Sequence, residues 1–387
     1  MIETASLVDQ HCHGVLRTEL GLGTFETRLG APAAGRSAAG TTLFDTQLGF
    51  AVRRWCPPLL GLEPHCPPAR YLARRRELGA LEAARRLLRA TGITTYLVDS
   101  GAGEGGEGTD DLAGPEEMAS LGAAGAHRIV RLERLAERVA DVSGGAGTFL
   151  AGLAETVHTE AATAVAFSCA SGTGATGGAG GKGETGGTSG TGGTEFAPEP
   201  PAPGAVRGAA ARWLSGRRAG GALTDPLLVR HLLWTAIATG RPLQLLPDGA
   251  DPTALTGFAA ATAGLGTDLV LLDPYPYHRQ AARLSGLFPH VYADLGPALA
   301  RTGPGAAAVL AQSLETAPFG KLLFSSGARG LPELQVVAVR GFAEAADRVL
   351  GGWVAEGAWS AGDARRVAGL IAGGNARRVY GLPPAGG

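Results

Sequence analysis

Short β-forming runs alternate with longer helical stretches along this chain, and this alternation limits the possible folds more than any other feature. The predicted strands cover residues 6–10, 94–99, 128–132, 164–169, 243–247, 269–273, 291–295 and 321–326. Strands joined by helices run parallel, because each helical crossover returns the chain to the same edge of the sheet. Eight such units predict an α/β fold, a (β/α)8 barrel of the TIM type. A doubly wound open sheet with an added helical region is the alternative.

Helix boundaries are marked at several places in the second half of the chain. Asp225 stands before one apolar stretch as an N-cap, and Gly240 follows its end. Apolar residues recur at helical spacing after Pro332. A further helix is predicted over residues 360–373 and is expected to end at a pair of glycines.

The length and apolar content suit one large domain. The chain has 387 residues, of which 45% are hydrophobic, so we expect a single barrel domain over 1–387. Residues 14–93 are too many for one connection, which predicts a helical insertion at 39–92 after the first strand. Residues 171–205 form a low-complexity Gly/Pro-rich loop that cannot bury a core of its own. This loop is either a mobile lid or a tolerated expansion.

The composition excludes several classes of partner. A formal net charge of −1 gives no basis for binding nucleic acid or an acidic membrane. No run reaches the roughly 18 apolar residues of a membrane helix, and no signal-peptide pattern is present. The four cysteines show neither CxxC spacing nor a disulfide framework. We therefore expect a cytoplasmic protein that binds a small molecule.

An apolar cluster within the predicted insertion suggests a different class of function. The cluster comprises Trp55, Pro57, Pro58, Leu59 and Leu60. If exposed, it would make the insertion a partner-binding module. Packing on the barrel or in a homo-oligomer interface is the alternative.

Two histidines lie at the end of the first predicted strand, in the stretch "SLVDQHCHG". His11 and His13 are two residues apart, so both side chains point to the same face of the strand. At the C-terminal end of a barrel strand they would face the mouth, where neutral imidazoles can bind a metal ion. Asp9 shares this face and could orient them. A structural pair of half-buried histidines is the alternative.

A second group of polar side chains follows the sixth predicted strand, in "DPYPYHRQA". Asp273 could serve as a metal ligand or as a catalytic base. His278 and Arg279 could contact an anionic substrate, or they could simply begin the next helix.

Several phrases together resemble the amidohydrolase superfamily, and more narrowly its amidohydrolase-2 branch, whose domains also occur fused to glutamine-synthetase-like proteins. The phrases are "VDQHCHG", "PLQLLPDGADP", "LVLLDPYPYHRQAARLSGLFPHVYADLG", "KLLFSSGARGLPEL" and "GNARRVYGL". The resemblance implies a (β/α)8 barrel with a metal centre at the strand C-termini. It also implies a metal-dependent hydrolase acting on C–N or related bonds, although some members are isomerases or decarboxylases.

The chain departs from the metal-binding pattern that this resemblance implies. His11 and His13 match the HxH of strand one, but Ser168 stands where strand four often carries Lys. The histidine expected at strand five is Leu246, and the aspartate expected at strand eight is Gly327. Neither can bind a metal ion or move a proton through its side chain.

Asp273 replaces the histidine expected at strand six, and a carboxylate can still bind a metal ion. One hypothesis is therefore a degenerate metal centre in a pseudoenzyme with weak or absent hydrolase activity and a binding or regulatory role. The other is an active hydrolase with a site rebuilt from His11, His13 and Asp273 around zinc, iron or manganese. Its general base is unassigned; His278 and Glu133 are candidates, and Glu133 and Arg279 are candidate substrate contacts.

Overall fold

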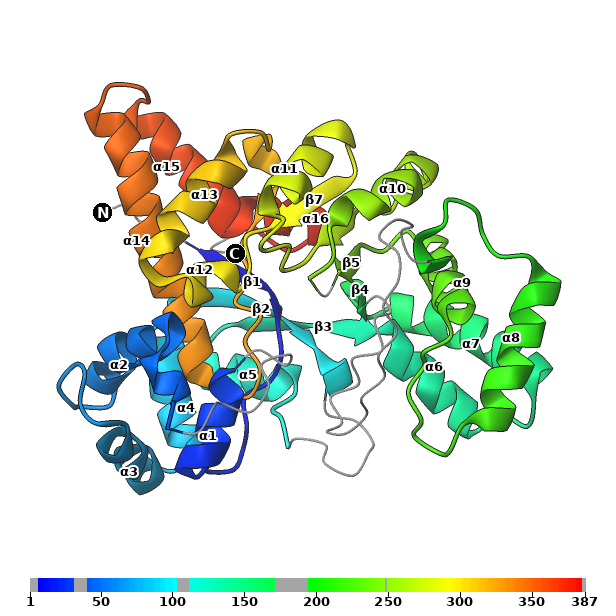
Figure 1. Cartoon of the computed structure of the whole chain (residues 1–387), viewed down its shortest axis with the longest axis horizontal. Helices are drawn as coiled ribbons and strands as arrows, with labels where there is room; N and C mark the ends of the chain where they lie inside the picture. The colour runs from blue at the N-terminus through cyan, green and yellow to red at the C-terminus, as the bar shows by residue number, and fades with distance from the viewer. Residues whose placement is uncertain (1–5, 31–39, 103–110, 171–193, 248, 385–387) are drawn as a thin grey trace.

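The computed structural model of the chain describes residues 6–30, 40–102, 111–170, 194–247 and 249–384 (Figure 1). Within these residues the strands lie at the centre of the molecule and the helices surround them (Figure 1). None of the described helices is long and apolar enough to cross a membrane.

Eight parallel strands form one sheet in the order β1 to β8. Their bounds are β1 Leu7–Cys12, β2 Ile93–Asp99, β3 Gly125–Arg131, β4 Ala166–Ala170, β5 Leu243–Leu246, β6 Leu269–Leu271, β7 Val291–Asp294 and β8 Leu322–Leu323. Residues after β8 complete the ring, because Gln10 N donates to Phe324 O at 3.2 Å and Gly327 N donates to His11 O at 3.0 Å. The predicted (β/α)8 barrel is confirmed, with each predicted strand in its expected order.

Sixteen α-helices lie in the described residues. They are α1 Leu22–Leu29, α2 Gln47–Leu59, α3 Pro68–Leu78, α4 Ala80–Arg89, α5 Pro115–Gly122, α6 Leu132–Asp141, α7 Ala146–Ala161, α8 Pro203–Gly216, α9 Pro226–Ile237, α10 Thr256–Thr262, α11 His278–Leu287, α12 Ala298–Arg301, α13 Ala306–Leu314, α14 Pro332–Ala355, α15 Ala361–Gly369 and α16 Asn375–Tyr380. The predicted cap of α9 is confirmed, since the Asp225 side chain accepts from Leu227 N at 2.9 Å.

The predicted end of the last helix is wrong. The chain stays helical past α15 through a π-helical segment, Leu370–Gly374, and continues directly into α16. Gly373 is needed there for close packing rather than for termination, because a Cβ at this position would stand 2.4 Å from Ser6 O.

The connection between β1 and β2 is largely helical in its described part, and α2, α3 and α4 fall within residues 39–92. The apolar cluster of this region is partly turned toward the core: Leu60 is buried, Trp55 and Leu59 are half-buried, and Pro58 is exposed. Of the Gly/Pro-rich loop, residues 171–193 lie outside the described residues.

The barrel interior has its own apolar core, separate from the larger core between the sheet and the helices. Side chains of the strands, such as Val8, Leu97 and Val270, meet Val379 and Tyr380 of α16 in this interior cluster. α16 lies at the N-terminal ends of the strands, because Asn375 Nδ2 donates to Leu322 O at 2.8 Å. The closed lower end leaves the C-terminal end of the barrel as the place for a site.

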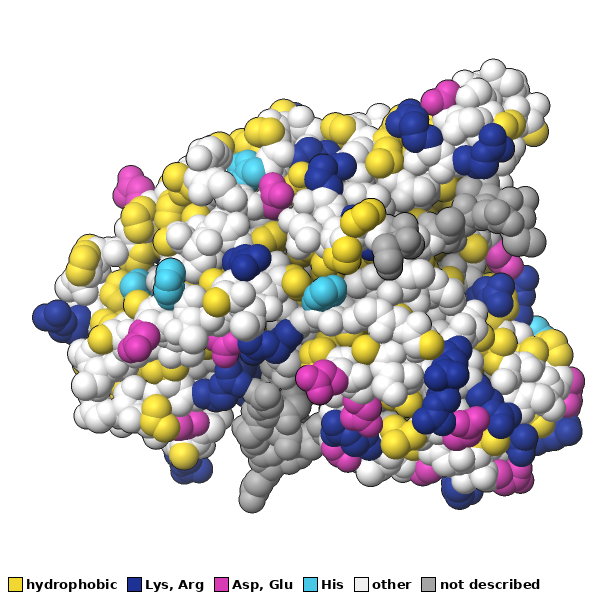
Figure 2. Space-filling model, turned by 180° about the vertical axis from the view of Figure 1, so that it is seen from behind, with side chains coloured by type: hydrophobic (Ala, Val, Ile, Leu, Met, Phe, Trp, Pro, Cys, Tyr) yellow, Lys and Arg dark blue, Asp and Glu magenta, His cyan; other side chains and the backbone are white. Residues whose placement is uncertain are grey.

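Charged side chains of both signs share the helical surface. On the face seen in Figure 2, Lys and Arg side chains stand beside Asp and Glu side chains. Pairs such as Arg54 with Glu344 at 2.6 Å and Arg86 with Glu82 at 2.9 Å are exposed, so solvent screens them and each contributes little to the stability of the fold.

Candidate metal centre

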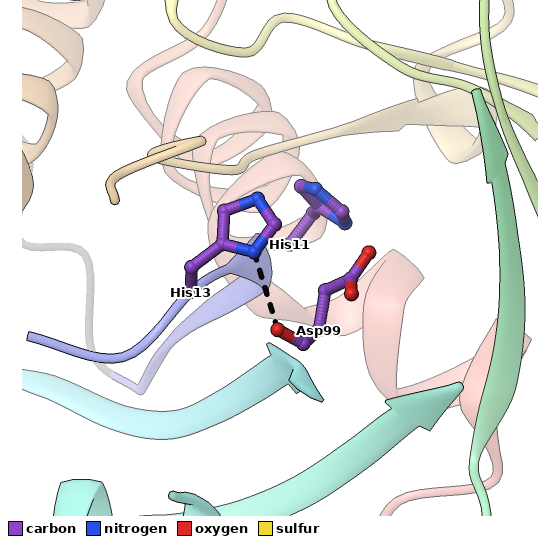
Figure 3. Close-up of side chains that lie close together, drawn as sticks. All are labelled: His11, His13 and Asp99. Carbon is purple, nitrogen blue, oxygen red and sulfur yellow. Dashed lines mark hydrogen bonds between the residues drawn. The ribbon is translucent and has the colours of Figure 1, made fainter. Parts of the chain in front are cut away.

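Three buried side chains converge where β1 and β2 end. His11 lies on β1, His13 directly follows it, and Asp99 is the last residue of the neighbouring strand β2. Each offers one ligand atom, and the three atoms lie within 4.8 Å of one another. Figure 3 shows the two rings and the Asp99 carboxylate gathered in this place. The predicted pairing of His11 with His13 on one face therefore holds, and a carboxylate joins them.

The ring nitrogens of both histidines are oriented for metal binding. His11 Nδ1 lies 2.8 Å from Gln244 Oε1, and His13 Nδ1 lies 3.2 Å from the backbone oxygen of Asp99 (Figure 3). A carbonyl oxygen only accepts, so Nδ1 carries the hydrogen in each ring. The lone pair is then on Nε2. A histidine that binds a metal through one ring nitrogen usually donates a hydrogen bond from the other, as both rings do here.

Burial sets the charge of these groups. It lowers the pKa of His13 to about 3 and lowers the pKa of His11, which the negative charges of Asp99 and Asp273 only partly oppose. Burial alone would raise the pKa of Asp99, but Arg131 and the two imidazoles hold that pKa well below its usual range. At neutral pH the centre thus presents two neutral imidazoles and one carboxylate.

The Asp99 carboxylate is fixed by donors from three neighbouring segments. Its Oδ2 accepts from Arg131 Nη2 at 2.9 Å, from Arg131 Nε at 3.2 Å and from Ser168 Oγ at 2.7 Å. Its Oδ1 accepts from Gly101 N at 3.0 Å. Oδ1 carries fewer hydrogen bonds and is the better ligand atom. Ser168, at the position of the lysine implied by the resemblance, orients the carboxylate.

The donor set fits a divalent metal ion. Two imidazole nitrogens and one carboxylate oxygen are the ligand types of zinc, iron and manganese sites, and three protein ligands leave a position open. Arg131 balances the charge of Asp99 through its bonds to Oδ2. The residues present therefore could hold such an ion.

Asp273 lies outside this group. Its carboxylate accepts a hydrogen bond from Arg301 Nη2 at 2.6 Å. Its backbone has a φ of +41°, which is uncommon for a residue other than glycine. Among the described residues, the group that meets the geometry of a metal site contains Asp99 in its place.

The structure gives the other predicted site residues partners outside the group of His11, His13 and Asp99. His278 begins α11, and its Nε2 lies 2.7 Å from Gln312 Oε1 of α13. Arg279 forms an exposed pair with Glu315 at 3.3 Å. Glu133, in the first turn of α6, accepts from Ala170 N at 2.6 Å, and burial raises its pKa.

The Asp9 side chain is held mainly by Ser326, which follows β8, and it contacts the backbone of His11 and not its ring. Its two carboxylate oxygens accept from Ser326 N at 2.7 Å and from Ser326 Oγ at 2.5 Å. Burial raises its pKa to about 7, although the bonds from Ser326 oppose the shift. Asp9 thereby joins β1 to the end of the barrel ring.

Leu246 and Gly327 occupy the positions where the resemblance implies a histidine and an aspartate, and neither side chain can bind a metal ion. Leu246 packs against the interior apolar cluster. Gly327 has a φ of +57°, and a Cβ there would stand 2.3 Å from Pro297 Cγ. The backbone at this position is therefore shaped for glycine.

Asp99 was missed by the sequence analysis although a signal was present. It ends the predicted strand 94–99, as Asp273 ends the predicted strand 269–273. In a barrel the second strand lies beside the first, so a carboxylate at its end must lie near His11 and His13.

Comparison with known protein sequences gives a partial match. No protein-family model matches the chain. A stretch of 106 residues is 35% identical to the protein fluG of Emericella nidulans, covering 27% of this chain and 12% of that protein. The chain thus corresponds to a small part of this relative's length.

Solved structures match over nearly the whole chain. A Lactobacillus casei protein assigned as a metal-dependent hydrolase matches with a TM-score of 0.77 and 19% identity, over 98% of this chain and 96% of that one. Glucuronate isomerase from Caulobacter crescentus matches with a TM-score of 0.62 and 14% identity, over 99% and 94%. Uronate isomerase from Thermotoga maritima matches with a TM-score of 0.59 and 13% identity, over 97% and 94%.

The chain shares its fold with these three solved structures. The barrel that the resemblance implies is therefore present. Identities of this size establish a shared fold and not an activity, so the function must be argued from the site itself.

Proposed function

We propose that this protein is an amidohydrolase-type barrel that binds one divalent metal ion, zinc, iron or manganese, through His11, His13 and Asp99. The ion would hold a small molecule at the barrel mouth, and hydrolytic activity would be weak or absent. The observation that carries the proposal is that three buried side chains bring ligand atoms within 4.8 Å of one another. In both histidines Nδ1 is hydrogen-bonded to a carbonyl oxygen, which leaves Nε2 available for a metal ion.

The side chains of the proposed metal site are preorganised for binding. The Asp99 carboxylate is held by Arg131, Ser168 and Gly101, so metal binding would require little ordering of the side chains. A bound divalent ion would supply a Lewis acid that polarises a carbonyl oxygen or acidifies a water molecule.

The expected weakness of hydrolysis follows from the proton-transfer groups. Hydrolysis also requires a base to take the proton of the attacking water, and such catalysis contributes roughly 10²- to 10⁴-fold. Gly327 has no side chain to do this, and Leu246 is apolar. We infer that binding of a small molecule, with a regulatory consequence, is the main role of the site.

A working hydrolase is the second candidate, with Asp273 as the base. Two observations favour it. The Asp273 charge raises the pKa of His11 against the effect of burial, so its carboxylate lies within electrostatic reach of the centre. Its φ of +41° is a conformation that often marks functional positions.

Metal analysis of purified protein tests the main proposal. We expect near one equivalent of zinc, iron or manganese in protein prepared without chelator, and none in the His11→Ala/His13→Ala variant. Asp99→Asn should reduce the metal content strongly, whereas the matched variant Asp273→Asn should retain it. Loss in Asp273→Asn and retention in Asp99→Asn would contradict the assignment. Metal content that is equal in all proteins would also contradict it.

A substrate screen then separates the two candidates. Metal-loaded protein would be assayed against amides, esters and lactones, beside its Asp273→Asn variant. Turnover that disappears in Asp273→Asn while the metal remains would support the hydrolase. Absence of turnover in metal-loaded protein would support the binding role.

A further inference from the structure

A chain of buried hydrogen bonds runs from the candidate metal centre to the lower end of the barrel. His11 Nδ1 contacts Gln244 Oε1 at 2.8 Å, and Gln244 Nε2 lies 2.8 Å from the Gln10 backbone oxygen and 2.8 Å from the Tyr380 hydroxyl. Tyr380 in turn donates to Gln10 Oε1 at 2.5 Å. All four residues are buried, so these polar atoms depend on one another for partners.

The direction of these bonds is decided by the backbone. The Gln10 backbone oxygen can only accept, so the Gln244 atom beside it must be the amide nitrogen. The amide oxygen of Gln244 therefore faces His11 and also can only accept. By elimination His11 Nδ1 carries the hydrogen, and its Nε2 carries the lone pair.

Tyr380 comes from the far end of the described chain. It belongs to α16, which packs into the interior cluster at the N-terminal ends of the strands. The Tyr380 hydroxyl and Gln10 both accept from the Gln244 amide nitrogen. These bonds oppose a 180° flip of the Gln244 side-chain amide. The helix that closes the bottom of the barrel thus contacts the chain of bonds that ends at His11.

We propose that Gln244 is a positioning residue that fixes the His11 tautomer for metal binding, and that Tyr380 holds Gln244 in this orientation. The metal part of this inference rests on the function proposed above. The tautomer part concerns the metal-free protein and can be tested without it.

The test combines the imidazole nitrogen chemical shifts of ¹⁵N-histidine-labelled, chelator-treated protein with a zinc dissociation constant from chelator competition. Wild-type protein should show His11 with hydrogen on Nδ1. Gln244→Leu should mix the two tautomers and weaken zinc binding about 10- to 100-fold. Tyr380→Phe should weaken it less than about tenfold, because Gln10 still holds the amide. Tyr96→Phe, which removes a hydroxyl from another buried ring away from this network, should change neither quantity.

A rescue variant guards against a folding defect. Gln244→Glu, with the oxygen that replaces Nε2 protonated and donating to the Gln10 backbone oxygen, keeps an accepting oxygen opposite His11 Nδ1. It should therefore retain the tautomer and bind zinc within a few-fold of wild type. Hydrogen on Nε2 in the metal-free wild type would overturn the inference. The inference would also be overturned if Gln244→Leu kept the His11 tautomer and the zinc affinity of the wild-type protein. If wild-type protein binds no zinc, the proposed function fails, while the nitrogen shifts still decide the tautomer assignment.

Discussion

The two sides of the barrel mouth differ in what their strand ends can do. We call one side the ligand arc, which comprises His11, His13, Asp99, Arg131 and Ser168. We call the other side the opposite arc, which comprises Leu246, Asp273 and Gly327. In the ligand arc one buried carboxylate accepts from Arg131 and Ser168 and lies beside the two imidazoles. In the opposite arc one residue is apolar, one has no side chain, and one is paired with an outlying arginine.

This contrast teaches that metal binding and proton transfer depend on different parts of the fold. Asp99 is fully buried and needs Arg131 and Ser168 to remain charged, so the ligand arc is also a stability element. Asp273 is 24% exposed and paired with an Arg301 that is 33% exposed, so water can replace its partner. Loss of the arginine partner should therefore lower folding stability much more in the ligand arc than in the opposite arc.

The largest expected effect comes from removing the arginine of each carboxylate pair. Arg131→Met should lower the free energy of unfolding by about 3 to 5 kcal/mol, because it leaves a buried carboxylate without its counter-ion. The matched variant Arg301→Met should lower it by about 1 kcal/mol or less. Urea unfolding of chelator-treated proteins would measure both, without any contribution from bound metal. Equal losses would mean that the two arcs do not differ as described.

A second prediction restores the missing carboxylate of the opposite arc. Gly327→Asp should lower the free energy of unfolding by about 2 to 4 kcal/mol, because φ is +57° and the new Cβ would meet Pro297. Gly381→Asp is the matched control, since φ there is +62° and no atom lies within 4 Å of the new Cβ. The control should lose about 1 kcal/mol. Thermal or urea unfolding checks the difference, which should vanish if Pro297 moves freely.

The smallest expected effect concerns two buried serines that each donate to an aspartate. Ser168 Oγ lies 2.7 Å from Asp99 Oδ2, and Ser325 Oγ lies 2.8 Å from Asp294 Oδ2. Both alanine variants should lower the free energy of unfolding by about 1 to 2 kcal/mol. Only Ser168→Ala should also weaken zinc binding, by about tenfold or more, because Asp99 is a ligand. Equal zinc affinity in the two variants would contradict the assignment of Asp99.

Most of the fold could be predicted because it depends on local patterns. Each strand is a run of β-forming residues between helix signals, and the order of eight such runs leaves few alternatives to a barrel. The end of the last helix could not be predicted, because Gly373 serves a close approach to β1 rather than a helix stop. That approach depends on tertiary packing, which sequence spacing does not reveal.

The candidate site could be predicted only in part. His11 and His13 were found because both lie on one face of a single strand, which is a local property. Asp273 was favoured as the third ligand because it stands where the resemblance implies the strand-six histidine and a carboxylate can bind a metal ion. Its partner Arg301 lies beyond the next strand, in α12. Asp99 satisfied the same rule on the strand next to β1 and was passed over. Its salt bridge with Arg131 depends on how neighbouring strands align.

Anomalous X-ray diffraction from crystals of zinc-loaded protein, recorded above and below the zinc absorption edge, tests the central claim most directly. We predict one strong peak about 2 Å from His11 Nε2, His13 Nε2 and an Asp99 carboxylate oxygen. A peak bound by Asp273 instead of Asp99, or no peak beside the two histidines, would contradict the assignment of the ligand arc as the metal centre.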